Sequence, residues 1–158
     1  MSATGFETTT HAEAETEALG CALARLMVAG GVIALRGDLA AGKTCFVRGM
    51  ARAVGEGGHV HSPTFTLVNE YGHAQKLFHL DLYRLNGPRE LIDLGYEEVF
   101  DGPHITAVEW AERAEDLLPA CRVEVALEHA GGDARLIQIE DRGVLPEGWR
   151  EALARVQP

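Results

Sequence analysis

Eight consecutive residues combine the residue types that bind a polyphosphate: Gly37-Asp38-Leu39-Ala40-Ala41-Gly42-Lys43-Thr44. They match the pattern G-x-x-x-x-G-K-[ST], in which glycines let the backbone wrap around phosphate oxygens and successive N–H groups form an anion-binding nest. Lys43 would bridge the β- and γ-phosphates as a compact charge, and the Thr44 hydroxyl would ligate Mg²⁺. The segment therefore predicts a site for a polyphosphate with Mg²⁺.

The choice of lysine in this segment supports the interpretation. The chain has only two lysines, Lys43 and Lys76, against twelve arginines. A planar guanidinium would fit a tight phosphate loop poorly, whereas an ammonium fits it as a point charge. A chain that otherwise prefers arginine thus has lysine where the pattern requires it.

A magnesium–nucleotide site also needs an acidic residue at the end of a neighbouring strand. Asp81 follows the apolar run 77–80, and Glu109 follows the apolar run 105–108. Periodicity does not rank the two, and either could be an ordinary carboxylate at a strand end. Both stay candidates for holding Mg²⁺ or for positioning the attacking water.

Other residues offer weaker signals. Ser62-Pro63-Thr64-Phe65 could form a switch segment that senses the γ-phosphate, or simply a capped turn that enters a strand. Trp110 could cover the nucleotide or pack in the core. His61, His79 and His104 are scattered singly, and we assign them no role.

The surrounding pattern predicts an α/β fold with a mixed parallel and antiparallel sheet. A capping-box pattern, Thr10 followed by Glu13, indicates a helix over 12–29, and the apolar run 32–35 indicates a buried strand directly before the loop. A helix over 46–54 follows the loop. Downstream we expect two hairpins (65–71 with 76–81, and 123–127 with 135–139), a strand over 105–109, and helices over 89–94, 111–118 and 149–156.

Composition indicates one domain spanning residues 1–158 and sets limits on the partners. Hydrophobic residues make up 46% of the chain, which is the balance of a globular protein. The net charge of -10 disfavours direct binding to nucleic acid or to anionic membranes. Three widely separated cysteines, no basic-then-apolar N-terminus and no run of about 20 apolar residues predict a reducing, cytoplasmic location.

Four motifs in order resemble the TsaE family, the bacterial ATPases of tRNA threonylcarbamoyladenosine biosynthesis. The motifs are the glycine-rich segment 37–44, Ser62-Pro63-Thr64-Phe65-Thr66-Leu67-Val68, His79-Leu80-Asp81-Leu82-Tyr83-Arg84-Leu85 and Val108-Glu109-Trp110. The resemblance implies a three-layer P-loop NTPase-like fold, ATP hydrolysis with Mg²⁺, and action with a TsaB–TsaD complex, so that tRNA is met only through the complex.

The resemblance also implies a role for individual residues. Lys43 corresponds to the phosphate-binding lysine, and Thr44 and Glu109 correspond to the Mg²⁺ ligands. Asp81 corresponds to a carboxylate important for activity, and Trp110 to the aromatic residue beside the site. The N-terminal threonine near the nucleotide base corresponds to Thr16.

Two residues depart from the family pattern, which usually reads Gly-Asp-Leu-Gly-Ala-Gly-Lys-Thr-Thr. This chain has Ala40 in place of the middle glycine and Cys45 in place of the final hydroxyl residue. Ala40 would be strained by about 1 kcal/mol or more if the loop needs a left-handed conformation there. We therefore expect weaker nucleotide binding or slower hydrolysis rather than a lost site.

Two other functions stay open. A small-molecule kinase would suit the chain length but should supply an arginine-rich lid, and Arg84, Arg89 and Arg113 are isolated in sequence. A non-catalytic adaptor would use bound nucleotide to stabilise a binding surface, with turnover eroded by Ala40 and Cys45. A GTPase is disfavoured because the chain contains no N-K-x-D motif.

Overall fold

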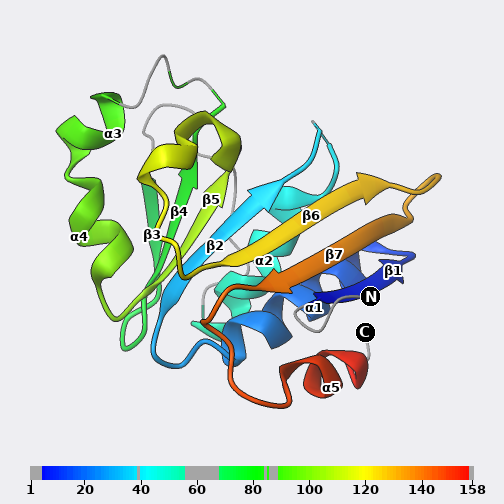
Figure 1. Cartoon of the computed structure of the whole chain (residues 1–158). Helices are drawn as coiled ribbons and strands as arrows, with labels where there is room; N and C mark the ends of the chain where they lie inside the picture. The colour runs from blue at the N-terminus through cyan, green and yellow to red at the C-terminus, as the bar shows by residue number, and fades with distance from the viewer. Residues whose placement is uncertain (1–4, 39, 56–67, 84, 86–88, 157–158) are drawn as a thin grey trace.

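The computed structural model describes residues 5–38, 40–55, 68–83, 85 and 89–156. Within these ranges seven strands form a single sheet in the order β1-β7-β6-β2-β5-β4-β3 (Figure 1). The strands are β1 (Gly5–Thr10), β2 (Gly31–Arg36), β3 (Val68–Tyr71), β4 (Leu77–Asp81), β5 (Ile105–Glu109), β6 (Val123–His129) and β7 (Arg135–Asp141). The helices are α1 (Glu13–Arg25), α2 (Lys43–Ala53), α3 (Arg89–Leu94), α4 (Tyr96–Asp101), the 3₁₀ helix η2 (Ala111–Leu117) and α5 (Trp149–Ala154).

The centre of the sheet is parallel and its two sides are antiparallel. Strand β2 pairs in parallel with both β5 and β6, and β4 pairs in parallel with β5. The pairs β6–β7, β1–β7 and β3–β4 are antiparallel. The predicted mixed sheet is confirmed. Because parallel strands present their carboxyl ends at one edge, β2, β4 and β5 bring the ends of three strands together.

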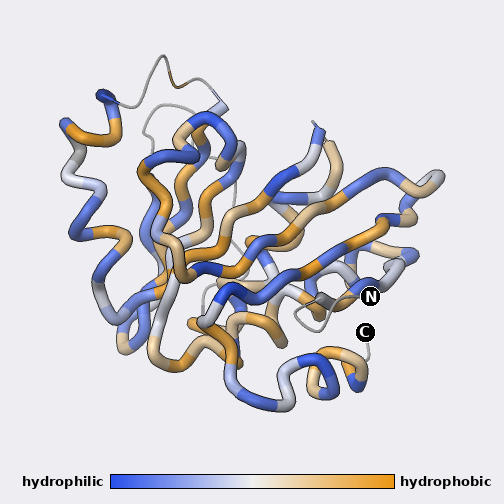
Figure 2. The backbone as a smooth tube through the Cα atoms, viewed as in Figure 1, coloured by the Kyte–Doolittle hydropathy of each residue, from blue (hydrophilic) through white to orange (hydrophobic). Residues whose placement is uncertain are grey.

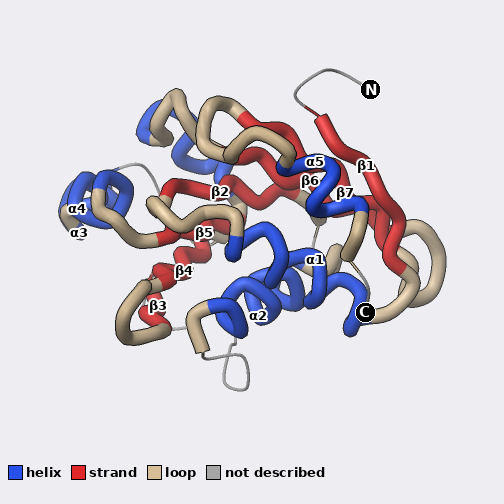
Figure 3. Tube along the Cα trace, turned by 90° about the horizontal axis from the view of Figure 1, so that it is seen from below, coloured by secondary structure: helices blue, strands red, loops and turns tan. Residues whose placement is uncertain are grey.

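Helices cover the two faces of the sheet and complete the predicted three layers. Residues of α1, α2 and α5 form one buried cluster with inward side chains of the strands, including Phe46, Met50 and Ile33. A second cluster joins the other face to α3, α4 and η2 through Leu91, Phe100 and other apolar residues. Figure 2 shows hydrophobic residues recurring along the central strands, and Figure 3 shows α1 and α2 side by side, apart from α3 and α4. No helix in the described ranges combines the length and apolar character needed to cross a bilayer.

Helices α1 and α2 approach each other closely at two glycines. A Cβ at Gly49 would lie 1.9 Å from the carbonyl oxygen of Glu17, and one at Gly20 would lie 2.2 Å from that of Phe46. Either distance is shorter than van der Waals contact allows, so both positions require glycine. The contact fixes α1 against the helix that follows the glycine-rich loop.

The start of the chain differs from the predicted helix cap. Thr10 ends β1, a strand that the pattern did not indicate, and Ala12 is the residue that caps α1. The Thr10 hydroxyl instead lies 2.7 Å from the Thr16 hydroxyl. At the other end, α1 stops at Arg25 rather than near residue 29, because Leu26 and Met27 bond to carbonyls three residues back and the backbone turns at Gly30.

Further along the chain most predicted elements are confirmed. Helix α3 and strand β5 have the predicted bounds, and β6 and β7 pair as the second hairpin. The first hairpin is formed by β3 and β4, while residues 65–67 of its predicted first strand lie outside the described ranges. Helix α4 was not predicted, and the helix expected over 111–118 is a 3₁₀ helix with a kink at Ala114.

Candidate functional site

The loop between β2 and α2 has the backbone geometry that a phosphate-binding segment needs. Gly37 and Gly42 both have positive φ angles, 150° and 102°, and Gly42 is the N-cap of α2. A Cβ at Gly37 would lie 2.4 Å from the carbonyl oxygen of Leu127 on β6, so this position also requires glycine for space. The loop ends at the first turn of an 11-residue helix, where N–H groups and the helix dipole favour an anion.

Ala40 adopts the left-handed conformation that the sequence pattern left open. Its φ angle is 61°, a region in which a residue with a Cβ is disfavoured by about 1–2 kcal/mol relative to glycine. The loop therefore carries local strain at this residue.

The side chain of Lys43 is folded back onto its own loop. Its ammonium donates hydrogen bonds to the carbonyl oxygens of Gly37 and of Asp38, the latter at 3.0 Å. The ammonium also lies 4.1 Å from the centroid of the Trp110 ring. Burial lowers the pKa of the Lys43 ammonium, while the charge of Glu109 opposes that shift.

Glu109 lies beside the hydroxyl of Thr44. Both carboxylate oxygens of Glu109 are 3.4 Å from Thr44 Oγ1, and the Glu109 side chain is buried at the carboxyl end of β5. The structure thus brings together the two residues expected to ligate Mg²⁺, one from the start of α2 and one from a strand end. Hydroxyl and carboxylate oxygens are ligands that Mg²⁺ accepts.

Asp81 is the neighbour of Glu109 across the β4–β5 pair. The two residues are partners in the parallel register, so both candidate carboxylates lie at the same edge of the sheet. Burial raises the pKa of the Asp81 carboxyl, and the backbone N–H of Tyr83, which donates to Oδ1 at 3.0 Å, acts in the opposite direction. Among the described residues no group of three or more His, Cys, Asp or Glu side chains gathers as a metal site.

His79 is a site residue that sequence reasoning missed. It is fully buried, and its Nε2 contacts Oε2 of Glu109. Its Nδ1 is buried and has no hydrogen-bond partner among the residues that the structure describes. The available signal was its place two residues before Asp81, because residues two apart on a strand share a face.

Trp110 both packs in the core and borders the loop. Its φ angle of 59° turns the chain sharply at the end of β5, and its half-buried ring lies against the second hydrophobic cluster. The centroid of the exposed Tyr83 ring is 5.0 Å from that of Trp110, and the guanidinium of Arg113 is 5.7 Å from the Tyr83 ring. Packing of Trp110 in the core, one of the two sequence-based interpretations, is thus confirmed, and a role in covering a nucleotide stays a prediction.

Thr16 and Cys45 lie where α1 meets the start of α2. The Cys45 thiol donates to the carbonyl oxygen of Glu13 at 3.5 Å, and Thr16 follows in the same helix, buried. Burial raises the pKa of the Cys45 thiol to about 11. Leu39 and the expected switch residues Ser62, Pro63, Thr64 and Phe65 lie outside the described ranges.

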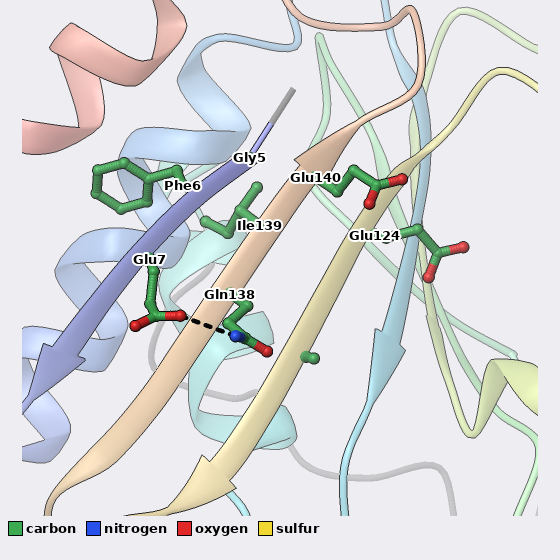
Figure 4. Close-up of a pocket in the computed structure, with 8 residues that line it drawn as sticks. Gly5, Phe6, Glu7, Glu124, Gln138, Ile139 and Glu140 are labelled. Atoms are coloured by element: carbon green, nitrogen blue, oxygen red, sulfur yellow. Dashed lines mark hydrogen bonds between the residues drawn. The ribbon is translucent and has the colours of Figure 1, made fainter. Parts of the chain in front are cut away.

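A separate pocket of about 340 Å³ lies on the outer surface of β1, β6 and β7 (Figure 4). Its carboxylates are already paired within the protein: Gln138 donates to Glu7 at 2.8 Å, and Arg36 donates to Glu124 at 2.6 Å. This lining offers no group that favours a phosphate. It consists of Gly5, Phe6, Glu7, Glu124, Ala126, Gln138, Ile139 and Glu140.

Comparison with known proteins identifies the family to which the chain is similar. Residues 10–137 match the family model described as threonylcarbamoyl adenosine biosynthesis protein TsaE. The tRNA threonylcarbamoyladenosine biosynthesis protein TsaE of Bacillus subtilis is 39% identical over 142 residues, covering 89% of each chain. The protein of the same name from Haemophilus influenzae is 42% identical over 109 residues, covering 68% of each.

A solved structure shares the fold over nearly the whole length. The crystal structure of Bacillus subtilis YdiB superimposes with a TM-score of 0.77 at 34% identity, covering 96% of this chain and 95% of the other. The fold, the matched residues and the relatives all agree, and the chain belongs to the TsaE family.

Proposed function

We propose that this protein binds and hydrolyses ATP with Mg²⁺ and serves tRNA threonylcarbamoyladenosine biosynthesis in the cytoplasm. One observation carries the proposal: a glycine-rich loop opens directly onto the pair Thr44 and Glu109, with their side-chain oxygens 3.4 Å apart. Membership in the TsaE family supports the pathway. This arrangement joins a phosphate cradle to a partial set of magnesium ligands at one sheet edge.

The residues present fit ATP and Mg²⁺. The positive φ angles at residues 37, 40 and 42 give the backbone the turns of an anion-binding nest. Thr44 and Glu109 would hold Mg²⁺, which when bound neutralises negative charge on the phosphates. Thr16 and Trp110 would line the nucleotide, beside the loop residues Gly37, Asp38, Leu39, Ala40, Ala41, Gly42, Lys43, Thr44 and Cys45.

We assign the remaining chemistry to Lys43 and Asp81. Lys43 exchanges its loop carbonyls for phosphate oxygens and stabilises the charge that develops during hydrolysis. Asp81 orients the attacking water, since its raised pKa makes it a better proton acceptor than an exposed aspartate. Ser62 to Phe65 would couple the nucleotide state to partner binding.

Variants of the two lysines test the proposal. We expect Lys43→Ala to lower ATPase kcat/KM by about 100-fold or more, because it removes a charge at the reacting phosphate. Glu109→Ala should lower it similarly. Lys76→Ala is the matched control, since Lys76 is exposed on the β3–β4 hairpin and pairs with Glu70 at 2.5 Å. Wild-type hydrolysis rates in Lys43→Ala and Glu109→Ala would show that the mechanism is wrong.

We further propose that TsaB-like and TsaD-like proteins are the partners and that tRNA is reached only through them. The net charge of -10 supports this, because such a surface repels the phosphates of RNA. The isolated chain should give no tRNA shift in a gel at physiological salt, whereas it should be recovered with the two partner proteins in a pull-down. A shift by the chain alone would contradict the indirect role.

The adaptor function is the alternative that an observation favours, because the strain at Ala40 is expected to slow turnover. Single-turnover hydrolysis with and without the partner complex separates the two functions. A catalytic chain converts bound ATP to ADP in at least one condition, whereas an adaptor retains ATP in both.

A further inference from the structure

His79, the buried histidine on β4, contacts Glu109 but has no role in the function proposed above. His79 Nε2 contacts Oε2 of Glu109, and both side chains are buried. In the parallel register His79 is level with Ala107, so Glu109 lies two residues further along β5 on the same face. The contact therefore crosses diagonally between two adjacent strands.

The surroundings of His79 fix which ring nitrogen carries the hydrogen. A carboxylate can only accept, so the contact with Glu109 places the hydrogen on Nε2. Nδ1 is buried without a partner in the described part of the chain, and a hydrogen there would be a buried donor with no acceptor. The centroid of the Tyr71 ring is 6.5 Å from that of the His79 imidazole. The imidazole of His79 thus donates one hydrogen bond, from Nε2 to Glu109.

We propose that His79 is a positioning residue that holds the Glu109 carboxylate in the orientation needed for Mg²⁺. This inference rests on the proposed function. By binding Oε2, His79 restricts the rotation of the carboxylate, and in that orientation both oxygens are equidistant from Thr44 Oγ1 at 3.4 Å. Residues that hydrogen-bond to a metal-ligating side chain typically raise the metal affinity about 10- to 100-fold.

Two replacements of His79 test whether its role is to donate a hydrogen bond to Glu109 or only to fill space in the core. His79→Gln keeps an N–H donor near the position of Nε2, whereas His79→Leu keeps a buried apolar volume and removes the donor. ATP binding is measured by calorimetry across a Mg²⁺ titration and again in EDTA. We expect His79→Leu to need about 10-fold more Mg²⁺ for half-maximal enhancement of ATP affinity, and His79→Gln to stay within about 3-fold of wild type.

Two controls complete the test: ATP affinity measured in EDTA, and the effect of His79→Leu in a protein that already carries Glu109→Ala. ATP affinity in EDTA should stay within about 2-fold in both variants, because the histidine acts through the metal ligand and not on the phosphates. In a Glu109→Ala background, His79→Leu should change the Mg²⁺ response by less than about 2-fold, since the residue it positions is gone. An equal loss in His79→Gln and His79→Leu, or an additive loss with Glu109→Ala, would overturn the inference.

The proposed function and this inference fail in different ways. If the wild-type protein shows no Mg²⁺-dependent ATP binding, the proposed function is wrong and the inference falls with it. If the wild type responds to Mg²⁺ and His79→Leu responds identically, only the inference is wrong. Far-UV circular dichroism and thermal melting identify a variant that fails to fold. If His79→Leu fails to fold, His79→Gln decides the question, because a loss of Mg²⁺ response well beyond about 3-fold in a folded His79→Gln protein would overturn the inference.

Discussion

The ammonium of Lys43 lies 4.1 Å from the centroid of the Trp110 ring while it donates to carbonyls of its own loop. A cation over an aromatic face is attracted by the ring quadrupole. Phosphate oxygens compete for the same ammonium, so binding of ATP should move it and change the environment of the indole. We therefore expect Trp110 fluorescence to respond to phosphate binding at the loop.

Fluorescence can test this relationship directly. The chain has two tryptophans, and Trp149 lies on α5 in the first hydrophobic cluster, so Trp149→Phe leaves Trp110 as the only tryptophan, which can be excited selectively at 295 nm or above, roughly where tyrosine no longer absorbs. We expect ATP with Mg²⁺ to change Trp110 emission in this variant, whereas adenosine, which lacks phosphates, should not. Unchanged emission at ATP saturation, with saturation shown by calorimetry, would contradict the prediction.

Glycine at position 40 should relieve the strain in the loop. The φ angle of 61° disfavours alanine by about 1–2 kcal/mol, and the greater flexibility of glycine in the unfolded chain offsets part of the gain. We expect Ala40→Gly to raise the free energy of unfolding by about 0.5–1 kcal/mol and to tighten ATP binding. Ala41→Gly is the matched control: Ala41 has no positive φ and is buried, so glycine there should destabilise. Equal effects of the two changes would refute the strain argument.

Threonine at position 45 should improve the site. Cys45 has only a weak side-chain donor, which reaches the carbonyl oxygen of Glu13 at 3.5 Å. We expect Cys45→Thr to increase ATP affinity and turnover about 2- to 10-fold, through a hydroxyl worth about 0.5–1.5 kcal/mol. Cys45→Val has the shape of threonine without the hydroxyl and should not improve either quantity. Unchanged ATP affinity and turnover in Cys45→Thr would show that this departure from the family pattern has no cost.

The ionised carboxylate of Asp81 should cost stability. Its pKa is raised in the folded state by burial, so the folded protein disfavours the charged form. We expect Asp81→Asn to melt at a higher temperature than wild type at pH 7 in the absence of nucleotide, while losing ATPase activity. Asparagine keeps the Oδ1 that accepts from Tyr83 N, whereas Asp81→Ala loses it and should gain less.

The pH dependence of the Asp81→Asn effect checks its origin. Above the raised folded pKa the carboxylate is charged in both states, and the cost is fully present. As the pH falls through that pKa toward 3.8, the ordinary pKa of an aspartate, the wild type becomes protonated and the cost disappears. The stability difference should therefore shrink on acidification, and a difference that grows would contradict the assignment.

The contact between α1 and α2 should tolerate no side chain at Gly49. A Cβ there would lie 1.9 Å from the carbonyl oxygen of Glu17, so Gly49→Ala must push the helices apart. We expect it to lower the free energy of unfolding by about 1–3 kcal/mol in denaturant titrations. Arg52 is exposed on the same helix and reaches α1 through an ion pair with Glu17 at 3.5 Å, so Arg52→Ala should change it by only about 0.5 kcal/mol. A neutral Gly49→Ala would show that the two helices adjust freely.

Local signals predicted the elements around the site well. Strand β5 and helix α3 have the predicted bounds because an unbroken apolar run and an N-terminal proline are strong short-range features. The glycine-rich loop was recognised for the same reason. The carboxylates Asp81 and Glu109 could not be ranked from sequence, because only the parallel β4–β5 register places them side by side.

The misses share a dependence on distant partners. Strand β1 is short and rich in threonine, and it exists because β7, over 120 residues away, pairs with it. Threonine is a residue type that often caps helices, but Thr10 is the last residue of β1, so Ala12 is the N-cap of α1. His79 has significance only through Glu109 on the next strand. Patterns within a short stretch of sequence cannot reveal these contacts, because the partner residues lie elsewhere in the chain.

The burial of Lys43 gives the protein an unusual chemical selectivity. Of its two lysines, Lys43 is held inside the loop, while the side chain of Lys76 is 48% exposed on the β3–β4 hairpin. Amine-directed dyes, cross-linkers or acetylating agents should therefore modify Lys76 first and leave the glycine-rich loop intact. The chain thus provides a near-unique side-chain attachment point away from its own candidate active site.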